Sequence, residues 1–125
     1  MFLGICDSSR KSDISGTYKF TKTVLENRGR NFKLVSLRDK KIFGCKAYLM
    51  CVEDNVCKIK DDFEALRDKI VRADAYVIGQ PDYYSGIYAL IHAILEQWFQ
   101  FRHRECDFLW GKIGVVVGVD GMLGK

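Results

Sequence analysis

The chain has 125 residues, of which 48% are hydrophobic and 13% aromatic, and its formal net charge is +4. This composition predicts one ordered globular domain over residues 1–125 and excludes a disordered or fibrous chain. Basic residues are spread along the chain, and no apolar run reaches the roughly 20 residues of a membrane-spanning helix, so we expect neither a nucleic-acid nor a membrane partner.

The hydrophobic pattern alternates between short β-type runs and longer helical runs. Strands are expected at residues 2–6, 32–36, 75–79 and 113–118, and helices at residues 15–27, 61–73 and 87–101. A long irregular segment, residues 37–60, follows the second strand. This βαβ alternation predicts a doubly wound α/β fold with a parallel sheet between two layers of helices. The first loop lacks the G-x-G-x-x-G pattern that is typical of dinucleotide-binding folds.

Ligands of such sheets bind beyond the carboxyl ends of the strands, so the loops that follow the first, third and fourth strands are candidates. The first loop is rich in serine and carries Arg10 and Lys11 just before a helix. Hydroxyl groups, a cation and the amides of a helix N-terminus suit a phosphate group. An ordinary polar loop with a serine cap would have the same composition, so both interpretations stay open.

The loop after the third strand carries Tyr83 and Tyr84 between Pro81 and Gly86. Adjacent tyrosines there favour a flat wall for a planar ligand, although they could also cover the core. The third loop, residues 118–121, is glycine-rich and would allow a close approach of the backbone. Together the three loops fit flavin mononucleotide (FMN) better than a free phosphate.

Three stretches carry a resemblance to a known family: residues 4–16 (GICDSSRKSDISG), 79–97 (GQPDYYSGIYALIHAILEQ) and 111–121 (GKIGVVVGVDG). They are similar, in order, to the phosphate loop, the flavin-ring loop with its helix, and the fourth strand of the flavodoxin-like NAD(P)H-dependent FMN reductases. The iron–sulfur flavoprotein branch of that family is the most similar. The resemblance implies a three-layer αβα fold with strand order 2-1-3-4.

The resemblance also implies the cofactor-binding residues. The FMN phosphate would be held by Ser8, Ser9, Arg10 and Ser15. The isoalloxazine would be lined by Pro81, Asp82, Tyr83, Tyr84, Ser85 and Gly86 on one side and by Gly118, Val119, Asp120 and Gly121 on the other. The chain departs from the family at Cys6-Asp7, where Ser-Gly is usual, so that a negative charge is expected near the phosphate. It also ends before the family's fifth strand, which would expose the fourth strand.

Cys45, Cys51 and Cys57 are evenly spaced in the long segment. The N-terminal residues lack the basic start of a signal peptide, so we expect a cytoplasmic protein whose cysteines are thiols or metal ligands. By the resemblance, this segment corresponds to the loop that binds a four-iron four-sulfur cluster, with Tyr48 at the position of one cysteine. Free thiols, a cluster with an outside ligand, and zinc completed by His92 or His103 all remain open.

These features predict an FMN-binding oxidoreductase that transfers electrons between NAD(P)H or an iron–sulfur carrier protein and an acceptor. The alternative is a non-enzymatic electron carrier or flavin-binding module with the same fold. No side chain is assigned a catalytic role. The helix at residues 87–101 is apolar on nearly every side until Gln97 and Gln100, which predicts a homo-oligomer with this helix at the contact. The alternative is that the cysteine-bearing segment covers the helix within one chain.

Overall fold

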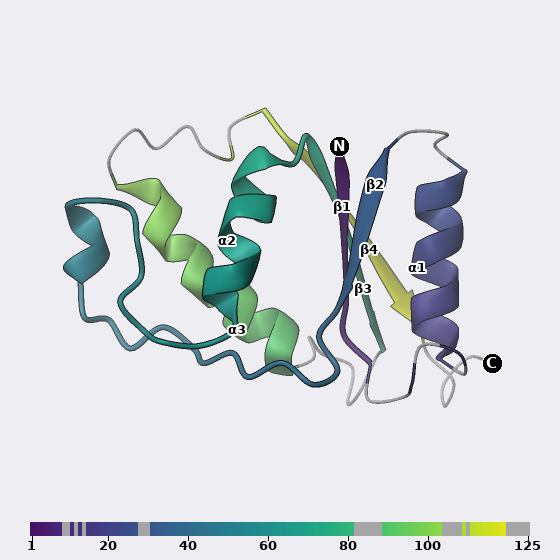
Figure 1. Cartoon of the computed structure of the whole chain (residues 1–125), viewed down its shortest axis with the longest axis horizontal. Coiled ribbons are helices and arrows are strands. Elements are labelled where there is room, and N and C mark those ends of the chain that lie inside the picture. Colours follow the sequence, from purple (N-terminus) through teal and green to yellow (C-terminus); the bar gives the residue numbers. More distant parts are fainter. Residues whose placement is uncertain are drawn as a thin grey trace.

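The computed structural model describes residues 1–8, 11, 13, 15–27, 31–81, 89–103, 109 and 111–119. Strands and helices alternate along this part of the chain (Figure 1). The strands are β1 (Phe2–Cys6), β2 (Phe32–Ser36), β3 (Ala75–Pro81) and β4 (Ile113–Val119). The α-helices are α1 (Gly16–Glu26), α2 (Phe63–Arg72) and α3 (Ala89–Gln97). Two short 3-10 helices are η1 (Met50–Val52) and η2 (Trp98–Arg102). The predicted strands and helices are therefore confirmed, with small differences at their ends.

The four strands form one parallel sheet in the order β2-β1-β3-β4. Helix α1 lies on one face of this sheet, and α2 and α3 lie on the other (Figure 1). The predicted strand order 2-1-3-4 and the three-layer αβα arrangement are thus confirmed. Because the strands are parallel, their carboxyl ends meet at one edge, where Cys6 is in register with Gly79 and Gln80 with Gly118.

The larger core lies between the sheet and the pair α2 and α3. It consists of fully buried apolar side chains such as Leu3, Ile5, Phe63, Ile70 and Ile94. This burial supplies most of the folding free energy, and in β1 it includes every residue after the half-buried Phe2.

A smaller core joins the sheet to α1 through Leu25, Val77 and Val117. The helix lies so close to β3 that a Cβ atom on Gly79 would collide with the Thr21 hydroxyl. Glycine at position 79 therefore sets how tightly α1 packs on the sheet.

Strand β4 is an edge strand with apolar residues in contact with solvent. The side chains of Ile113 and Val116 are 69% and 65% exposed, whereas Val117 is buried against α1. The expected exposure of the fourth strand is thus seen among the described residues. No helix in the described part of the chain is long and apolar enough to cross a membrane.

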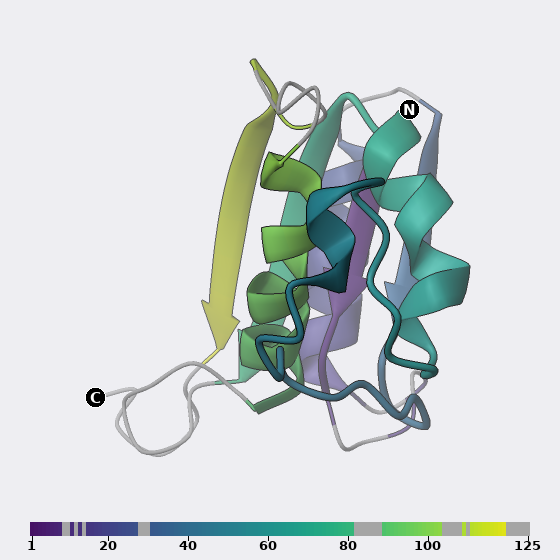
Figure 2. The ribbon, with the colours of Figure 1, turned by 90° about the vertical axis from the view of Figure 1, so that its left-hand side faces the viewer.

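Residues 37–60, which we call the cysteine segment, run along α3 and return to the start of α2 (Figures 1 and 2). Three hydrogen bonds fasten the cysteine segment to α3 and η2: Gln97 Nε2 to Phe43 O (2.7 Å), Cys45 N to Glu96 Oε1 (3.1 Å), and Cys57 N to Gln100 Oε1 (3.0 Å). Gln97 and Gln100 are both 2% exposed. The two glutamines, at which the apolar character of the helix ends in the sequence, therefore anchor a covering segment.

The acidic pair Asp61 and Asp62 connects the start of α2 to the cysteine segment. Asp61 Oδ1 accepts a hydrogen bond from Phe63 N (3.0 Å). The helix begins at Phe63, so Asp61 and Asp62 precede its first turn. Their carboxylates accept hydrogen bonds from the backbone N–H groups of Phe43 (2.9 Å) and Lys41 (2.6 Å). These amides belong to an irregular segment without strand partners, so the two acids satisfy donors that would otherwise lack them.

Candidate functional site

The loop between β1 and α1 brings two buried hydroxyl groups together at the carboxyl edge of the sheet. Ser15 caps α1, with its Oγ accepting a hydrogen bond from Tyr18 N (3.1 Å). The same hydroxyl donates to Ser8 Oγ at 2.8 Å, and the two residues are 1% and 7% exposed. The pair is positioned because serine is a favoured N-cap and because Ser15 N is held by the Lys11 carbonyl (2.8 Å).

The start of α1 beside these hydroxyls is sterically open. A Cβ atom added to Gly16, the first residue of the helix, would have no heavy atom of the described residues within 4 Å. An 11-residue helix whose N-terminus faces an open position, flanked by two serine hydroxyls, provides N–H and O–H donors for a phosphate group. The described residues of this loop therefore fit the phosphate of FMN.

The structure places five of the predicted cofactor-binding residues at this one edge of the sheet. Ser8 and Ser15 lie at the ends of the β1–α1 loop, Pro81 ends β3, and Gly118 and Val119 end β4. Pro81 is in register with Val119, so the second and third loops leave the sheet side by side. Nine further predicted residues lie outside the described ones: Ser9, Arg10, Asp82, Tyr83, Tyr84, Ser85, Gly86, Asp120 and Gly121.

Asp7 is the buried acid of the site, and its side chain is 2% exposed. The carboxylate accepts hydrogen bonds from the backbone N–H groups of Leu90 and Ile91, in the first turn of α3. Burial raises the pKa of Asp7 to about 6, and these two hydrogen bonds oppose the rise. Its Oδ2 atom has no hydrogen-bond partner among the described residues.

The sequence identified the charge of Asp7 but not its contact with α3. Backbone N–H of Asp7 donates to the Gly79 carbonyl (2.9 Å), which ties Asp7 to the end of β3. The neighbouring thiol, Cys6, is buried, and burial together with the charge of Asp7 raises its pKa to about 11. Cys6 is thus a protonated core residue at neutral pH, as its position in a buried strand predicts.

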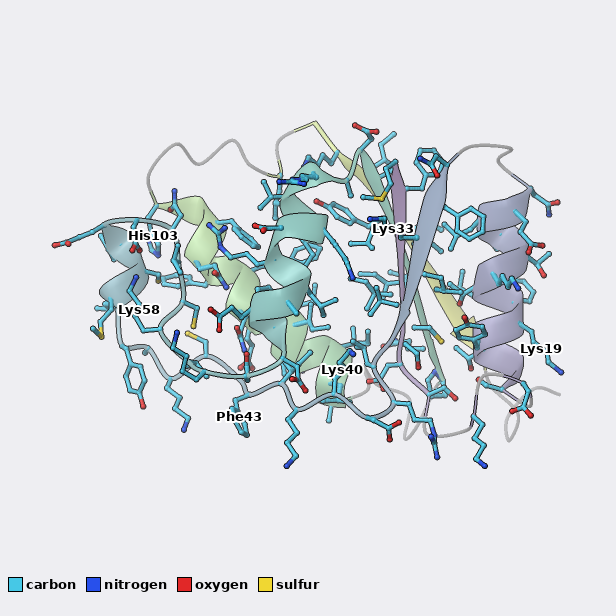
Figure 3. All side chains as sticks on the ribbon, in the orientation of Figure 1. Lys19, Lys33, Lys40, Phe43, Lys58 and His103 are labelled. Atoms are coloured by element: carbon cyan, nitrogen blue, oxygen red, sulfur yellow. The ribbon has the colours of Figure 1, made fainter. Side chains whose placement is uncertain are left out.

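The three cysteines of the cysteine segment line one pocket with Tyr48 and Phe99. The Cys51 Sγ atom lies 3.4 Å from Nε2 of His103, at the end of η2. Figure 3 shows His103 close to the outer turn of the cysteine segment, on the same side as Lys58. Burial raises the pKa of Cys51, and the nearby Cys57 and Cys45 raise it further, so this thiol is mainly protonated at neutral pH.

The pocket does not fit a complete metal cluster as it stands. It offers three cysteine thiols, whereas a four-iron four-sulfur cluster normally takes four thiolates. Among the described residues, no three His, Cys, Asp or Glu side chains converge as a metal site requires. Of the two histidines, His103 contacts Cys51, whereas His92 is exposed and lies 3.7 Å from Glu96.

The backbone of the cysteine segment is unusual in a way that the sequence did not reveal. Ala47, Leu49 and Asn55 have φ angles of 57°, 59° and 59°, a left-handed conformation that costs non-glycine residues roughly 1–2 kcal/mol each. Asn55 is 3% exposed and accepts a hydrogen bond from His103 N (3.2 Å) through Oδ1. Its carbonyl accepts another from Arg67 Nη2 (2.9 Å) in α2. The sequence signal for the left-handed backbone at Asn55 was the tendency of asparagine to adopt positive φ.

A parallel sheet of order 2-1-3-4 between helical layers, with a polar loop after β1, defines a flavodoxin-like domain. The structure of RosB with the bound intermediate 8-demethyl-8-formylriboflavin-5'-phosphate shares this fold. Its TM-score is 0.71 at 19% sequence identity, and the match covers 96% of this chain and 52% of RosB. The family model for NADPH-dependent FMN reductase matches residues 1–124, and the chain belongs to that family.

The curated relatives place the chain in the iron–sulfur flavoprotein branch of the family. An iron–sulfur flavoprotein of Archaeoglobus fulgidus is 31% identical over 121 residues, which are 97% of this chain and 62% of that protein. A second protein of the same name and organism is 28% identical over 124 residues, which are 98% of this chain and 56% of that protein. The chain therefore spans less than two thirds of the length of these relatives.

Proposed function

We propose that the chain binds FMN at the carboxyl edge of its sheet and acts as a flavin oxidoreductase. The observation that carries this proposal is the buried pair of Ser8 and Ser15 hydroxyls at the open N-terminus of α1. This arrangement offers donors to a phosphate group, and it occurs in a member of the NADPH-dependent FMN reductase family.

In this proposal the phosphate is bound by Ser8, Ser9, Arg10 and Ser15, and the flavin ring lies between residues 81–86 and 118–121. Bound FMN would supply the electron-transfer chemistry, which the protein's own side chains do not provide. The chain would bind the cofactor, orient its ring and limit its contact with water. No side chain needs to move a proton, so we assign no general acid or base.

The electron donor in the proposal is NAD(P)H or an iron–sulfur carrier protein. The family description supports the nicotinamide, whereas the iron–sulfur carrier stays a prediction from the sequence. A non-enzymatic electron carrier with the same cofactor is distinguished by one measurement. An enzyme oxidises NADH or NADPH when FMN and an acceptor are added, whereas a carrier does not take electrons from the nicotinamide.

The test is a titration of the protein with FMN and with riboflavin, followed by flavin fluorescence. Riboflavin shares the ring and lacks the phosphate, so Arg10→Ala should weaken FMN binding more than riboflavin binding. Lys33→Ala is the matched control, because it removes one positive charge from β2 at a distance from the carboxyl edge (Figure 3). An equal loss for both flavins would show that the phosphate assignment is wrong.

A further inference from the structure

Asp7 places a buried carboxylate directly beside the loop that would receive the two negative charges of a phosphate. It is covalently next to Ser8, whose hydroxyl is paired with Ser15 at the phosphate loop. The carboxylate is buried and points to the first turn of α3, which follows the proposed flavin-ring loop. Asp7 therefore lies between the elements that would bind the two ends of FMN.

The surroundings of Asp7 offer hydrogen-bond donors but no compensating cation among the described residues. From β1 it meets the protonated thiol of Cys6, from β3 the backbone of Gly79, and from α3 two amides. The titratable groups further along α3, His92 and Glu96, are 61% and 45% exposed and pair with each other. On the loop itself, the side chains of Lys11 and Asp13 are exposed.

An ionised Asp7 and a phosphate dianion would repel each other in this partly desolvated region. Two charges near a protein surface interact several times more strongly than in bulk water. The amides and dipole of α3 stabilise the carboxylate, but they do so equally with and without a phosphate. The approach of a phosphate group therefore favours the protonated form of Asp7. The proton would come from solvent and reside on Oδ2, the oxygen without a partner among the described residues.

We propose that binding of the phosphate end of FMN is linked to protonation of Asp7, so that affinity for FMN decreases as this carboxyl ionises while affinity for riboflavin changes much less. The inference rests on the proposed function, because it assumes a flavin phosphate at Ser8 and Ser15. It goes beyond that function by making Asp7 a specificity-determining residue. At acidic pH the site would favour the phosphorylated flavin, and at alkaline pH it would discriminate weakly between FMN and riboflavin.

The experiment measures the dissociation constants of FMN and riboflavin between about pH 5 and about pH 8 for the natural protein and for Asp7→Asn. Asparagine keeps an oxygen that can accept the hydrogen bonds from Leu90 and Ile91, but it has no charge. The phosphate of FMN titrates near pH 6 by itself, and this contribution is the same for both proteins. We expect the natural protein to lose up to about tenfold in FMN affinity per pH unit beyond the loss seen with Asp7→Asn.

Calorimetry in two buffers of different ionisation enthalpy provides a second readout. At neutral pH the natural protein should take up more protons with FMN than Asp7→Asn does, and neither should take up protons with riboflavin. Asp7→Ser, which also lacks the charge, serves in the same comparison if Asp7→Asn does not fold.

The outcomes separate this inference from the proposed function. Equal pH dependence of FMN binding in the natural and charge-free proteins would overturn the inference and leave FMN binding intact. An equal loss of FMN and riboflavin affinity with rising pH would also overturn it, because the linkage would not involve the phosphate. Failure of the natural protein to bind either flavin at any pH would overturn both.

Discussion

The side-chain amide of Gln97 donates a hydrogen bond of 2.6 Å to Oδ2 of Asp61, across 36 residues of sequence. The same nitrogen donates to the Phe43 carbonyl at 2.7 Å, and the same carboxylate oxygen accepts from Phe43 N at 2.9 Å. One glutamine of α3 thus fixes both the start of α2 and the cysteine segment. Because the glutamine is buried, these contacts cannot be exchanged for water without a cost in free energy.

Replacing Gln97 with leucine should lower the free energy of unfolding by about 2 kcal/mol, because Asp61 and the Phe43 carbonyl lose a buried donor. Urea denaturation measures the loss. Hydrogen exchange should show faster exchange of the amides of Phe43 and Cys45 than in the natural protein. His92→Leu, an exposed substitution on the same helix, is the control and should leave both readouts unchanged. A similar stability for Gln97→Leu would mean that the cysteine segment is held by other contacts.

Replacing Ser15 with alanine should lower the free energy of unfolding by about 1 kcal/mol, because α1 loses its N-cap. The same variant should bind FMN more weakly and riboflavin almost as before, since the hydroxyl pair with Ser8 is lost. Thr23→Ala removes an exposed hydroxyl from the later part of α1 and serves as the control. A Ser15→Ala protein with unchanged discrimination between the two flavins would contradict the phosphate assignment.

The stability of the protein without flavin should decrease as pH rises through about 6. Burial raises the pKa of Asp7 from its ordinary value of 3.8 to about 6, so the folded state binds this proton more tightly than the unfolded state. The resulting stabilisation is complete below about pH 4 and is lost as Asp7 ionises in the folded protein. Asp7→Asn should therefore be more stable than the natural protein at pH 8, by roughly 2–3 kcal/mol.

Urea midpoints at pH 5 and pH 8 check this prediction. Asp54→Asn is the control, because the pKa of Asp54 is shifted in the opposite direction. The hydrogen bond from Lys58 lowers that pKa, so the Asp54 carboxylate stops stabilising the folded protein only in acid. A natural protein and an Asp7→Asn variant with parallel pH profiles would show that Asp7 does not titrate in this range.

The cysteine segment should not hold a stoichiometric four-iron four-sulfur cluster in the natural protein. Such clusters normally take four thiolates, and Tyr48, 59% exposed, stands where the resemblance places one of them. Anaerobic reconstitution should yield well under one cluster per chain, and Tyr48→Cys should raise the yield. Visible absorption and iron analysis quantify both proteins. A stable, full complement in the natural protein would show that His103 or another group completes the ligand set.

We expect the protein to form a homo-oligomer at micromolar concentration, as the apolar helix at residues 87–101 predicts. The cysteine segment covers part of that helix within the chain, while β4 leaves Val116 exposed at the sheet edge. Sedimentation velocity of Phe99→Glu and Val116→Glu separates the two surfaces. Dissociation by Phe99→Glu alone would place the contact at the helix, and dissociation by Val116→Glu alone would place it at β4. A natural protein that sediments as a monomer would contradict the prediction.

Hydrophobic periodicity predicted the order and type of the elements because each element buries one repeating face. The apolar runs of β1 and β3 could only be central parallel strands, and the serine before α1 is a standard start of a helix. The carboxyl edge as the place of the site followed from the same topology. The place of Ser8 and Ser15 at this edge followed from the topology, whereas their role in binding phosphate came from the family resemblance and stays a prediction.

The contacts of Gln97, Gln100 and Asp7 were decided by the tertiary structure alone. In the sequence, both glutamines stand where the apolar character of the helix ends, and Asp7 stands as a negative charge beside the phosphate loop. The fold instead buries all three, because the irregular cysteine segment and the N-terminus of α3 carry backbone groups that need partners. Which distant side chain satisfies such a group depends on how helices pack across the sheet, and that information is not contained in any local pattern.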